Sequence, residues 1–204
     1  TKEKLRTDLE NLESFYKDRG YLQFEISSSQ VSISDDLQEL FITLVLNEGK
    51  RYKLNDIKIS GELPLDREFL ESFINIQEDA FYSESLITSY EEFYANALGN
   101  DGYTFAEVEG VPTIDEENNS ADITFVFNPG RKNYARRIIF NGNYFTTDEV
   151  LRREMRQFEG APASNQLIEQ SKLLLERTGF FKTVNVETVP VAGDDDLADI
   201  KFDV

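Results

Sequence analysis

An internal repeat of about 80 residues constrains the fold of this chain more than any other feature of its sequence. The segment Ile42-Thr43-Leu44-Val45-Leu46-Asn47-Glu48-Gly49 matches Ile123-Thr124-Phe125-Val126-Phe127-Asn128-Pro129-Gly130 at an offset of 81, and Ile200-Lys201-Phe202-Asp203-Val204 follows 77 residues later. A glycine followed by an aromatic residue recurs in step, at Gly20, Gly102 and Gly179. Self-similarity at this period predicts three copies of one small structural unit.

A complete copy is predicted to contain a strand, two helices and two further strands. In the middle copy, apolar residues spaced as on one helix face follow Glu84, and Gly102 supplies the left-handed position that ends this helix. The expected strands are 52–60, 105–114 and 121–128 in the middle copy, 134–141, 181–190 and 197–204 in the last, and 24–33 and 40–47 in the first; the expected helices are 66–74, 84 onward, 147–157 and 164–177. The predicted class is α+β, in tandem βααββ units that each form a three-stranded mixed sheet with two helices on one face.

The unit boundaries are expected at the short connections between copies. Residues 1–49 read as the C-terminal half of a unit, because the strand that opens the other copies has no counterpart there, while 50–130 and 131–204 read as complete units. The chain also opens at Thr1 within a helical pattern, so we expect it to be a piece of a longer protein.

Composition excludes several functional classes. The 204 residues hold 21 basic and 39 acidic side chains, a formal charge of −18, which would repel the phosphates of a nucleic acid. With no histidine and no cysteine, imidazole or thiolate metal sites, Ser-His triads and disulfides are excluded, and neither a cofactor nor a metal is expected. The longest dense apolar stretch, Leu40 to Leu46, is far shorter than the roughly 20 residues of a membrane-spanning helix.

The βααββ pattern with its glycine-aromatic step resembles the polypeptide-transport-associated (POTRA) domain, and three stretches sharpen the resemblance to the POTRA domains of the BamA family of outer-membrane barrel-assembly proteins. They are Val150-Leu151-Arg152-Arg153-Glu154-Met155-Arg156-Gln157-Phe158-Glu159-Gly160, Leu174-Leu175-Glu176-Arg177-Thr178-Gly179-Phe180-Phe181 and Glu48-Gly49-Lys50-Arg51-Tyr52-Lys53-Leu54. The resemblance implies the second half of the third POTRA domain, then the fourth and the fifth.

What the resemblance implies is a non-enzymatic module at the periplasmic face of the bacterial outer membrane. Its partners would be unfolded outer-membrane β-barrel precursors and lipoproteins of the BamD kind, with BamB as a further candidate, and a membrane barrel of the same chain would follow Val204. The POTRA region of another transporter, TamA-like or of the two-partner secretion type, is the alternative within the family. A carboxylate-based periplasmic hydrolase is the alternative from another class.

Precursors would bind by strand addition. The first strand of each hairpin is expected at a sheet edge, where unpaired backbone N–H and C=O groups can accept an extended chain. The residues predicted to form these client edges are Phe24, Ile26, Val31, Phe105, Val108, Phe181 and Val184.

The last copy carries most of the positive charge and the predicted lipoprotein site. Residues 131–204 hold 11 basic and 12 acidic residues, whereas Glu68 to Gly130 contains no lysine or arginine, which reads as a solvated acidic face. Arg152, Arg156 and Glu159 are expected on one helix stripe beside an inward stripe of Leu151, Met155 and Phe158, and Thr146-Thr147-Asp148-Glu149 fits a capping box. In the BamA family the acid before the helix-terminal glycine contacts an arginine of BamD, and that position is Glu159 here.

Acidic clusters are the remaining material for chemistry. They are Asp35-Asp36 with Glu39, Asp115-Glu116-Glu117 with Asp122, and Asp194-Asp195-Asp196 with Asp199. None has the alternating ligands, central glycine and terminal glutamate of a calcium loop, and all fall at the same hairpin position of the repeat. A repeated polar turn is therefore the preferred interpretation.

Overall fold

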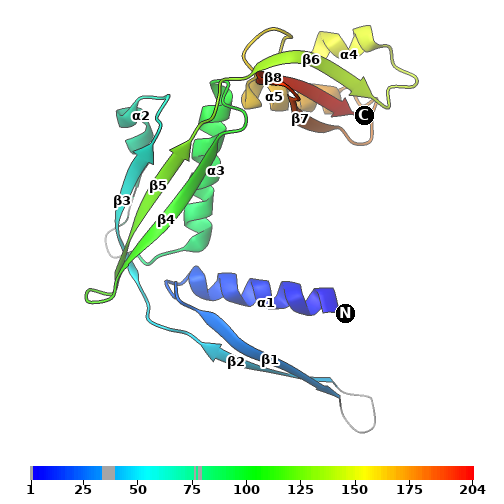
Figure 1. Cartoon of the computed structure of the whole chain (residues 1–204). Helices are drawn as coiled ribbons and strands as arrows, with labels where there is room; N and C mark the ends of the chain where they lie inside the picture. The colour runs from blue at the N-terminus through cyan, green and yellow to red at the C-terminus, as the bar shows by residue number, and fades with distance from the viewer. Residues whose placement is uncertain (1, 34–39, 76, 78–79) are drawn as a thin grey trace. The chain divides into compact units, whose positions relative to one another are not determined.

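The computed structural model describes residues 2–33, 40–75, 77 and 80–204, and it contains three separate β-sheets with helices packed against them (Figure 1). The chain divides into two compact units. One consists of Thr1–Ile59, Ser72–Tyr90 and Gly110–Phe125, and the other of Ser60–Glu71, Glu91–Glu109 and Val126–Val204.

The N-terminal elements are helix α1 (Lys2–Lys17) and an antiparallel hairpin of strands β1 (Glu25–Ile33) and β2 (Leu40–Asn47). The Tyr16 ring of α1 stacks on Phe24 at a centroid distance of 4.2 Å, which fixes the start of the hairpin against the helix. Most of β2 remains exposed, although its sequence is apolar.

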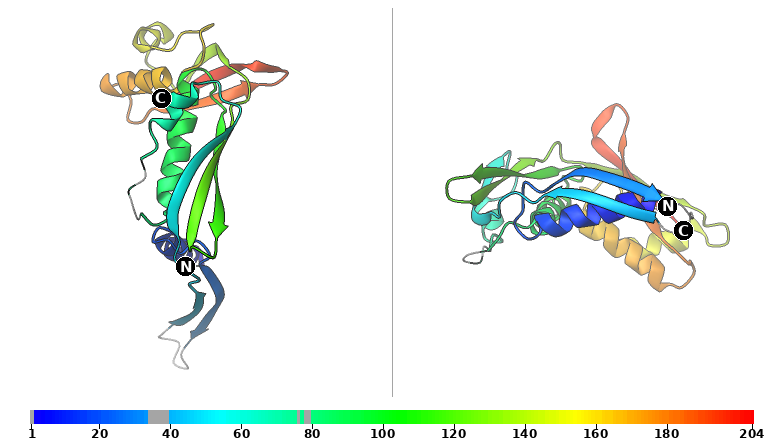
Figure 2. Two further views of the ribbon diagram at one scale, coloured as in Figure 1. Left: turned by 90° about the vertical axis from the view of Figure 1, so that its left-hand side faces the viewer. Right: turned by 90° about the horizontal axis from the view of Figure 1, so that it is seen from below.

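The middle sheet has the strand order β3-β5-β4 and is accompanied by two helices. Its buried residues alternate along β5, as expected for a strand that buries one face, and α3 lies along that sheet (Figures 1 and 2). The elements are β3 (Lys53–Gly61), α2 (Arg67–Glu71), α3 (Glu84–Asn100), β4 (Glu107–Asp115) and β5 (Ser120–Asn128).

The last sheet has the order β6-β8-β7, with β6 parallel and β7 antiparallel to the central strand. Ala198, Ile200 and Phe202 of β8 are fully buried on one face, and Ile200 and Phe202 belong to one core cluster with Leu151 and Leu175 of the two helices. The elements are β6 (Tyr134–Asn141), α4 (Asp148–Glu154), α5 (Asn165–Arg177), β7 (Asn185–Val191) and β8 (Asp194–Asp203).

The glycine-aromatic step ends the second helix of a copy and receives the next copy's first strand. Gly20 and Gly102 adopt φ of +95° and +103°, the left-handed region that glycine enters without steric cost. The Gly20 carbonyl accepts the Tyr52 N–H at 2.8 Å, and the Gly102 carbonyl accepts the Asn133 N–H at the same distance. The repeated step therefore has a structural role that its spacing alone did not reveal.

The predicted α+β class, with two three-stranded mixed sheets covered by helices, is confirmed. Three local predictions are wrong. No side-chain hydrogen bond caps α4 at Thr147, so the capping box is absent, and α4 ends at Glu154 because Met155 is extended. The run Asp194-Asp195-Asp196 begins β8 and is not a loop, since the turn falls just before it at Gly193.

Candidate functional site

The first strand of every hairpin lies at a sheet edge. The strand orders β1-β2, β3-β5-β4 and β6-β8-β7 leave β1, β4 and β7 with one hydrogen-bonded neighbour each. Such strands can accept an extended chain on their outer side. The topology thus supplies the geometry that strand addition needs.

Only part of the predicted client residues lies in these strands. Ile26 and Val31 belong to β1 and Val108 belongs to β4, but the strands begin later than predicted, at Glu25, Glu107 and Asn185. The other predicted residues precede the strands: Phe24 and Val184 are buried, Phe181 packs on the core of the last sheet, and Phe105 is 40% exposed. The reason is that the turn after the glycine-aromatic step occupies these positions, with Phe24 and Ala106 each donating an N–H to a carbonyl three residues earlier.

Proline distinguishes the three edges. Val108-Glu109-Gly110-Val111-Pro112 of β4 and Val186-Glu187-Thr188-Val189-Pro190 of β7 share one pattern, whereas β1 contains no proline. Proline lacks an N–H, so in a sheet it occurs where the backbone nitrogen of that residue points away from the neighbouring strand. There it weakens pairing with a further strand. This signal was present in the sequence and points to β1 as the unprotected edge.

The register shows which β1 groups face outward. The N–H and C=O groups of Ile138 in β6 bond to side chains outside the sheet. Ile200 of β8 pairs with Ile138 in the parallel register, so the backbone groups of Ile200 point toward β6 and away from β7. Thr188, paired with Ile200, therefore faces outward together with Pro190. In the first hairpin, Ile42 is the repeat counterpart of Ile200 and pairs with Val31. The Val31 N–H is thus expected to face the open edge, and its side chain is 48% exposed.

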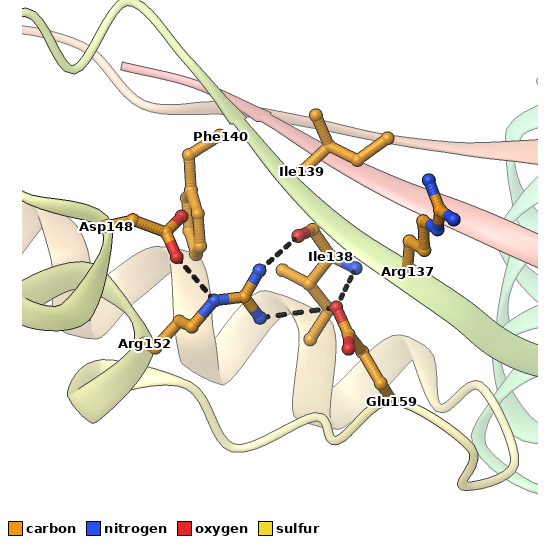
Figure 3. A pocket seen from close by; sticks show the side chains of 7 residues that line it. All are labelled: Arg137, Ile138, Ile139, Phe140, Asp148, Arg152 and Glu159. Carbon is orange, nitrogen blue, oxygen red and sulfur yellow. Dashed lines mark hydrogen bonds and ion pairs between the residues drawn. The ribbon is translucent and has the colours of Figure 1, made fainter.

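The opposite edge of the last sheet is closed by a side-chain pair (Figure 3). Glu159 accepts the Ile138 N–H at 2.8 Å, and Arg152 donates to the Ile138 carbonyl at 3.0 Å and to Glu159 at 3.2 Å. Arg152 is held in turn by Asp148, at 2.6 Å. The pocket at this edge has a volume of about 420 Å³ and is lined by Arg137, Ile138, Ile139, Phe140, Asp148, Arg152 and Glu159.

The charges of this pair stabilise each other. The Ile138 N–H and, to a smaller extent, the Arg152 guanidinium lower the pKa of Glu159, against the opposing effect of burial. The hydrogen bond to Asp148 is the main cause that raises the pKa of Arg152. Glu159 is therefore an ionised acceptor with both a backbone and a side-chain partner, and its side chain is still 42% exposed.

A buried amide and a buried hydroxyl position Glu159, and neither was predicted. Gln157 is fully buried, donates to the carbonyls of Phe158 and Pro162 and accepts the Ser164 N–H. The Ser171 hydroxyl accepts the N–H groups of Arg156 and Gln157. These bonds hold the segment between α4 and α5 in a turn that returns Glu159 to β6.

Arg156, Phe158 and Glu159 were all expected on this helix, and these three predictions are wrong because α4 ends at Glu154. Arg156 lies beyond the helix, its guanidinium donates to the Met155 carbonyl, and it does not line the pocket with Arg152 and Glu159. Phe158 is 68% exposed and does not join Leu151 and Met155 in the core.

The acidic clusters give no support to a hydrolase. Asp115 accepts the N–H groups of Glu117 and Asn118, as a polar turn predicts, while Asp35, Asp36 and Glu39 lie outside the described residues. Within the described ranges, no group of three or more acidic side chains could hold a metal ion. A general acid needs a raised pKa, and that of Glu159 is lowered.

None of the helices in the described part of the chain is long and apolar enough to cross a membrane.

Comparisons with known proteins agree with this architecture. Residues 1–49, 52–130 and 134–204 match the POTRA family, described as a surface antigen variable number repeat. The outer membrane protein assembly factor BamA of Neisseria meningitidis is 30% identical over 201 residues, which are 98% of this chain and 25% of that protein. The chain thus spans about a quarter of the length of this curated relative.

Two crystal structures are similar over most of the chain. POTRA domains 3–5 of BamA from Haemophilus influenzae superpose with a TM-score of 0.90 at 33% identity, covering 98% of this chain and 79% of that one. BamA from Haemophilus ducreyi lacking POTRA domains 1–3 has a TM-score of 0.65 at 36% identity, covering 74% of this chain and 29% of that one.

Proposed function

The chain belongs to the POTRA family, and from this membership we propose that it is the periplasmic POTRA module of a BamA-like outer-membrane protein assembly factor. In this proposal residues 1–49, 50–130 and 131–204 are part of a third POTRA domain, a fourth and a fifth. The module catalyses no reaction: it holds unfolded β-barrel precursors and docks lipoproteins beside the membrane.

One observation carries the proposal for precursors, namely that β1 is an edge strand without proline while β4 and β7 each contain one. An extended precursor segment would pair with β1 on the side of the Val31 N–H. Each backbone hydrogen bond contributes a net free energy of only about 0.5 to 1.5 kcal/mol, so a few bonds give weak and reversible binding. Reversible binding suits a module that must pass its client on.

Peptide titration followed by amide chemical shifts tests this assignment. The probe is a synthetic strand of about 10 residues with alternating apolar and polar side chains, the length and pattern of a barrel strand. We expect the largest shifts in β1 and smaller ones in β4 and β7. Equal shifts in all three strands, or shifts confined to β4 and β7, would contradict the assignment of β1.

Docking of a BamD-like lipoprotein is proposed at Glu159. Its side chain is 42% exposed and lines the pocket at the β6 edge, which leaves it accessible to an arginine from a partner. Such an arginine would compete with Arg152 for the carboxylate. Binding of the partner's arginine would therefore replace the ion pair between Glu159 and Arg152, which limits the net free energy of binding.

Charge reversal at Glu159 tests the docking site. Glu159→Lys should weaken the complex with the lipoprotein, and an arginine-to-glutamate change on the partner should restore it. Glu159→Gln is the matched control, because it also loses the ion pair with Arg152 but introduces no repulsion. If Glu159→Lys binds as tightly as Glu159→Gln at low salt, the site is assigned wrongly.

A further inference from the structure

The loop between β6 and α4 carries the two most exposed large hydrophobic side chains among those described. Tyr144 is 90% exposed and Phe145 is 103% exposed. The loop is nevertheless held in a defined turn, because the Tyr144 N–H donates to the Gly142 carbonyl at 2.8 Å and the Asn143 amide donates to the Thr146 carbonyl at 3.1 Å. The two rings therefore project from an ordered support.

The fold itself does not require exposed aromatic side chains at this place. In the middle copy, the equivalent positions 81 residues earlier are Leu63 and Pro64, and both are half-buried. The last copy thus replaces two smaller, partly covered residues with two rings that lie fully in solvent. Adjacent exposed apolar groups of this size commonly mark a contact surface.

The loop lies at the end of the sheet where the described chain leaves it. β6 runs parallel to β8, Asn141 pairs with Asp203, and the Val204 N–H donates to the Asn141 carbonyl at 2.9 Å. Gly142 has φ of +88°, and a Cβ there would meet the Val204 carbonyl oxygen. In Figure 1 the loop after β6 accordingly lies next to the C-terminus.

This end is the one that would face the membrane under the proposed function, on which the inference rests. The similar Haemophilus ducreyi chain lacks POTRA domains 1–3, and the part that aligns with this protein is only 29% of it, so most of that outer-membrane factor lies beyond its POTRA domains. By analogy, the sheet end at Val204 points toward the membrane. Phenylalanine and tyrosine favour the boundary between lipid headgroups and acyl chains.

We propose that the Tyr144-Phe145 loop is an interfacial anchor that inserts its two rings into a phospholipid surface. Residues 131–204 hold 11 basic and 12 acidic side chains, so the unit that carries the loop gains little attraction from anionic lipids, and the expected surface is zwitterionic phospholipid. A weak anchor suffices, because under the proposed function the loop already lies close to the membrane, which gives it a high effective concentration at the surface.

The absence of tryptophan from the chain allows a direct test. Phe145→Trp places a single fluorophore in the loop, and Phe158→Trp places one at another exposed phenylalanine. Phe158 lies near the opposite end of β6, since the neighbouring Gly160 N–H donates to the Ala135 carbonyl. Each protein is held by a C-terminal polyhistidine tag on phosphatidylcholine vesicles that contain a nickel-chelating lipid, with or without bromine on the acyl chains.

The anchor predicts that the emission of Phe145→Trp shifts to shorter wavelength and is quenched by brominated lipid, while Phe158→Trp changes in neither respect. Without the tag, replacing both rings (Tyr144→Ser with Phe145→Ser) should lower vesicle affinity by roughly tenfold, as expected for withdrawing part of two rings from the interface. Equal quenching of the two tryptophans, or none in Phe145→Trp, would overturn the anchor.

A client-peptide titration of the same variants separates this inference from the proposed function. Absence of lipid quenching in Phe145→Trp, together with normal peptide binding, would overturn the anchor alone. Absence of peptide binding in the wild-type chain would instead overturn the proposed client function.

Discussion

Glu159 combines a structural role with the docking role that is proposed for it. Its carboxylate closes the β6 edge by accepting the Ile138 N–H and forms an ion pair with Arg152, while nearly half of the side chain stays accessible. A place on an outward helix stripe would leave Glu159 without internal partners. The structure instead gives it two, so its replacement should affect stability as well as the proposed docking.

Glu159→Gln should lower the free energy of unfolding by about 0.5 to 1 kcal/mol at neutral pH, since a charged acceptor becomes a neutral one at a partly exposed site. The sign of the pH dependence follows from its lowered pKa. A carboxyl whose folded pKa lies below its ordinary value of 4.5 stabilises the fold above that pH, and this contribution is lost as the pH falls through the folded pKa.

Urea unfolding of both proteins between pH 7 and pH 3 measures this difference. The two curves should converge in the acid range. A difference that stays constant with pH would show that the carboxylate charge does not contribute to stability.

At the scale of elements, the exposed hairpin of β1 and β2 stands apart from the two complete sheets. Leu40, Phe41 and Val45 of β2 are each more than half exposed, and β2 has only β1 as a neighbour in its sheet. An apolar strand with an open edge favours pairing between molecules. This exposed strand is the element on which the solution behaviour of the chain should depend most.

We expect the wild-type chain to self-associate reversibly through β2, and Val45→Lys to reduce this association by placing a charge on the strand. The hairpin should survive the change, because the Val45 side chain is 53% exposed. Sedimentation equilibrium over a range of concentrations measures both proteins. A wild-type chain that stays monomeric at the highest concentration would contradict the prediction.

The sequence pattern predicted β2 and β6 with their observed bounds, because the apolar residues of each strand end at an asparagine, Asn47 and Asn141. It placed the starts of β1, β4 and β7 too early, since an aromatic residue in a turn resembles the first residue of a strand. It extended α4 past Glu154, because the apolar spacing continues through Met155 and Phe158 after the backbone has become extended.

The closed β6 edge could not be predicted from spacing. It depends on the Gln157 and Ser171 hydrogen bonds, which only tertiary packing brings together. The glutamate itself was found through the family resemblance, whereas its internal partners at Ile138 and Arg152 required the structure.

At the scale of the whole molecule, the repeat produces similar sheet edges that differ in whether they are protected against pairing with a further strand. β4 and β7 carry a proline, the β6 edge is closed by Glu159 and Arg152, and β1 has neither device on its outer side among the described contacts. Among the first strands of the hairpins, β1 alone is unprotected, and it can therefore hold a client at a defined place. This asymmetry is the central claim of the proposed function.

Replacing Val31 tests that claim most directly. Val31→Pro removes one outward N–H from β1, as Pro190 does in β7, while Val31→Ala shortens the same side chain and keeps the N–H. Circular dichroism and thermal unfolding establish that both variants retain the fold, and calorimetric titration with the alternating peptide gives the affinities. Val31→Ala should bind like the wild type, and Val31→Pro should bind roughly 2- to 13-fold more weakly, the equivalent of one hydrogen bond. Equal affinity of Val31→Pro and Val31→Ala, with both folded, would contradict strand addition at β1.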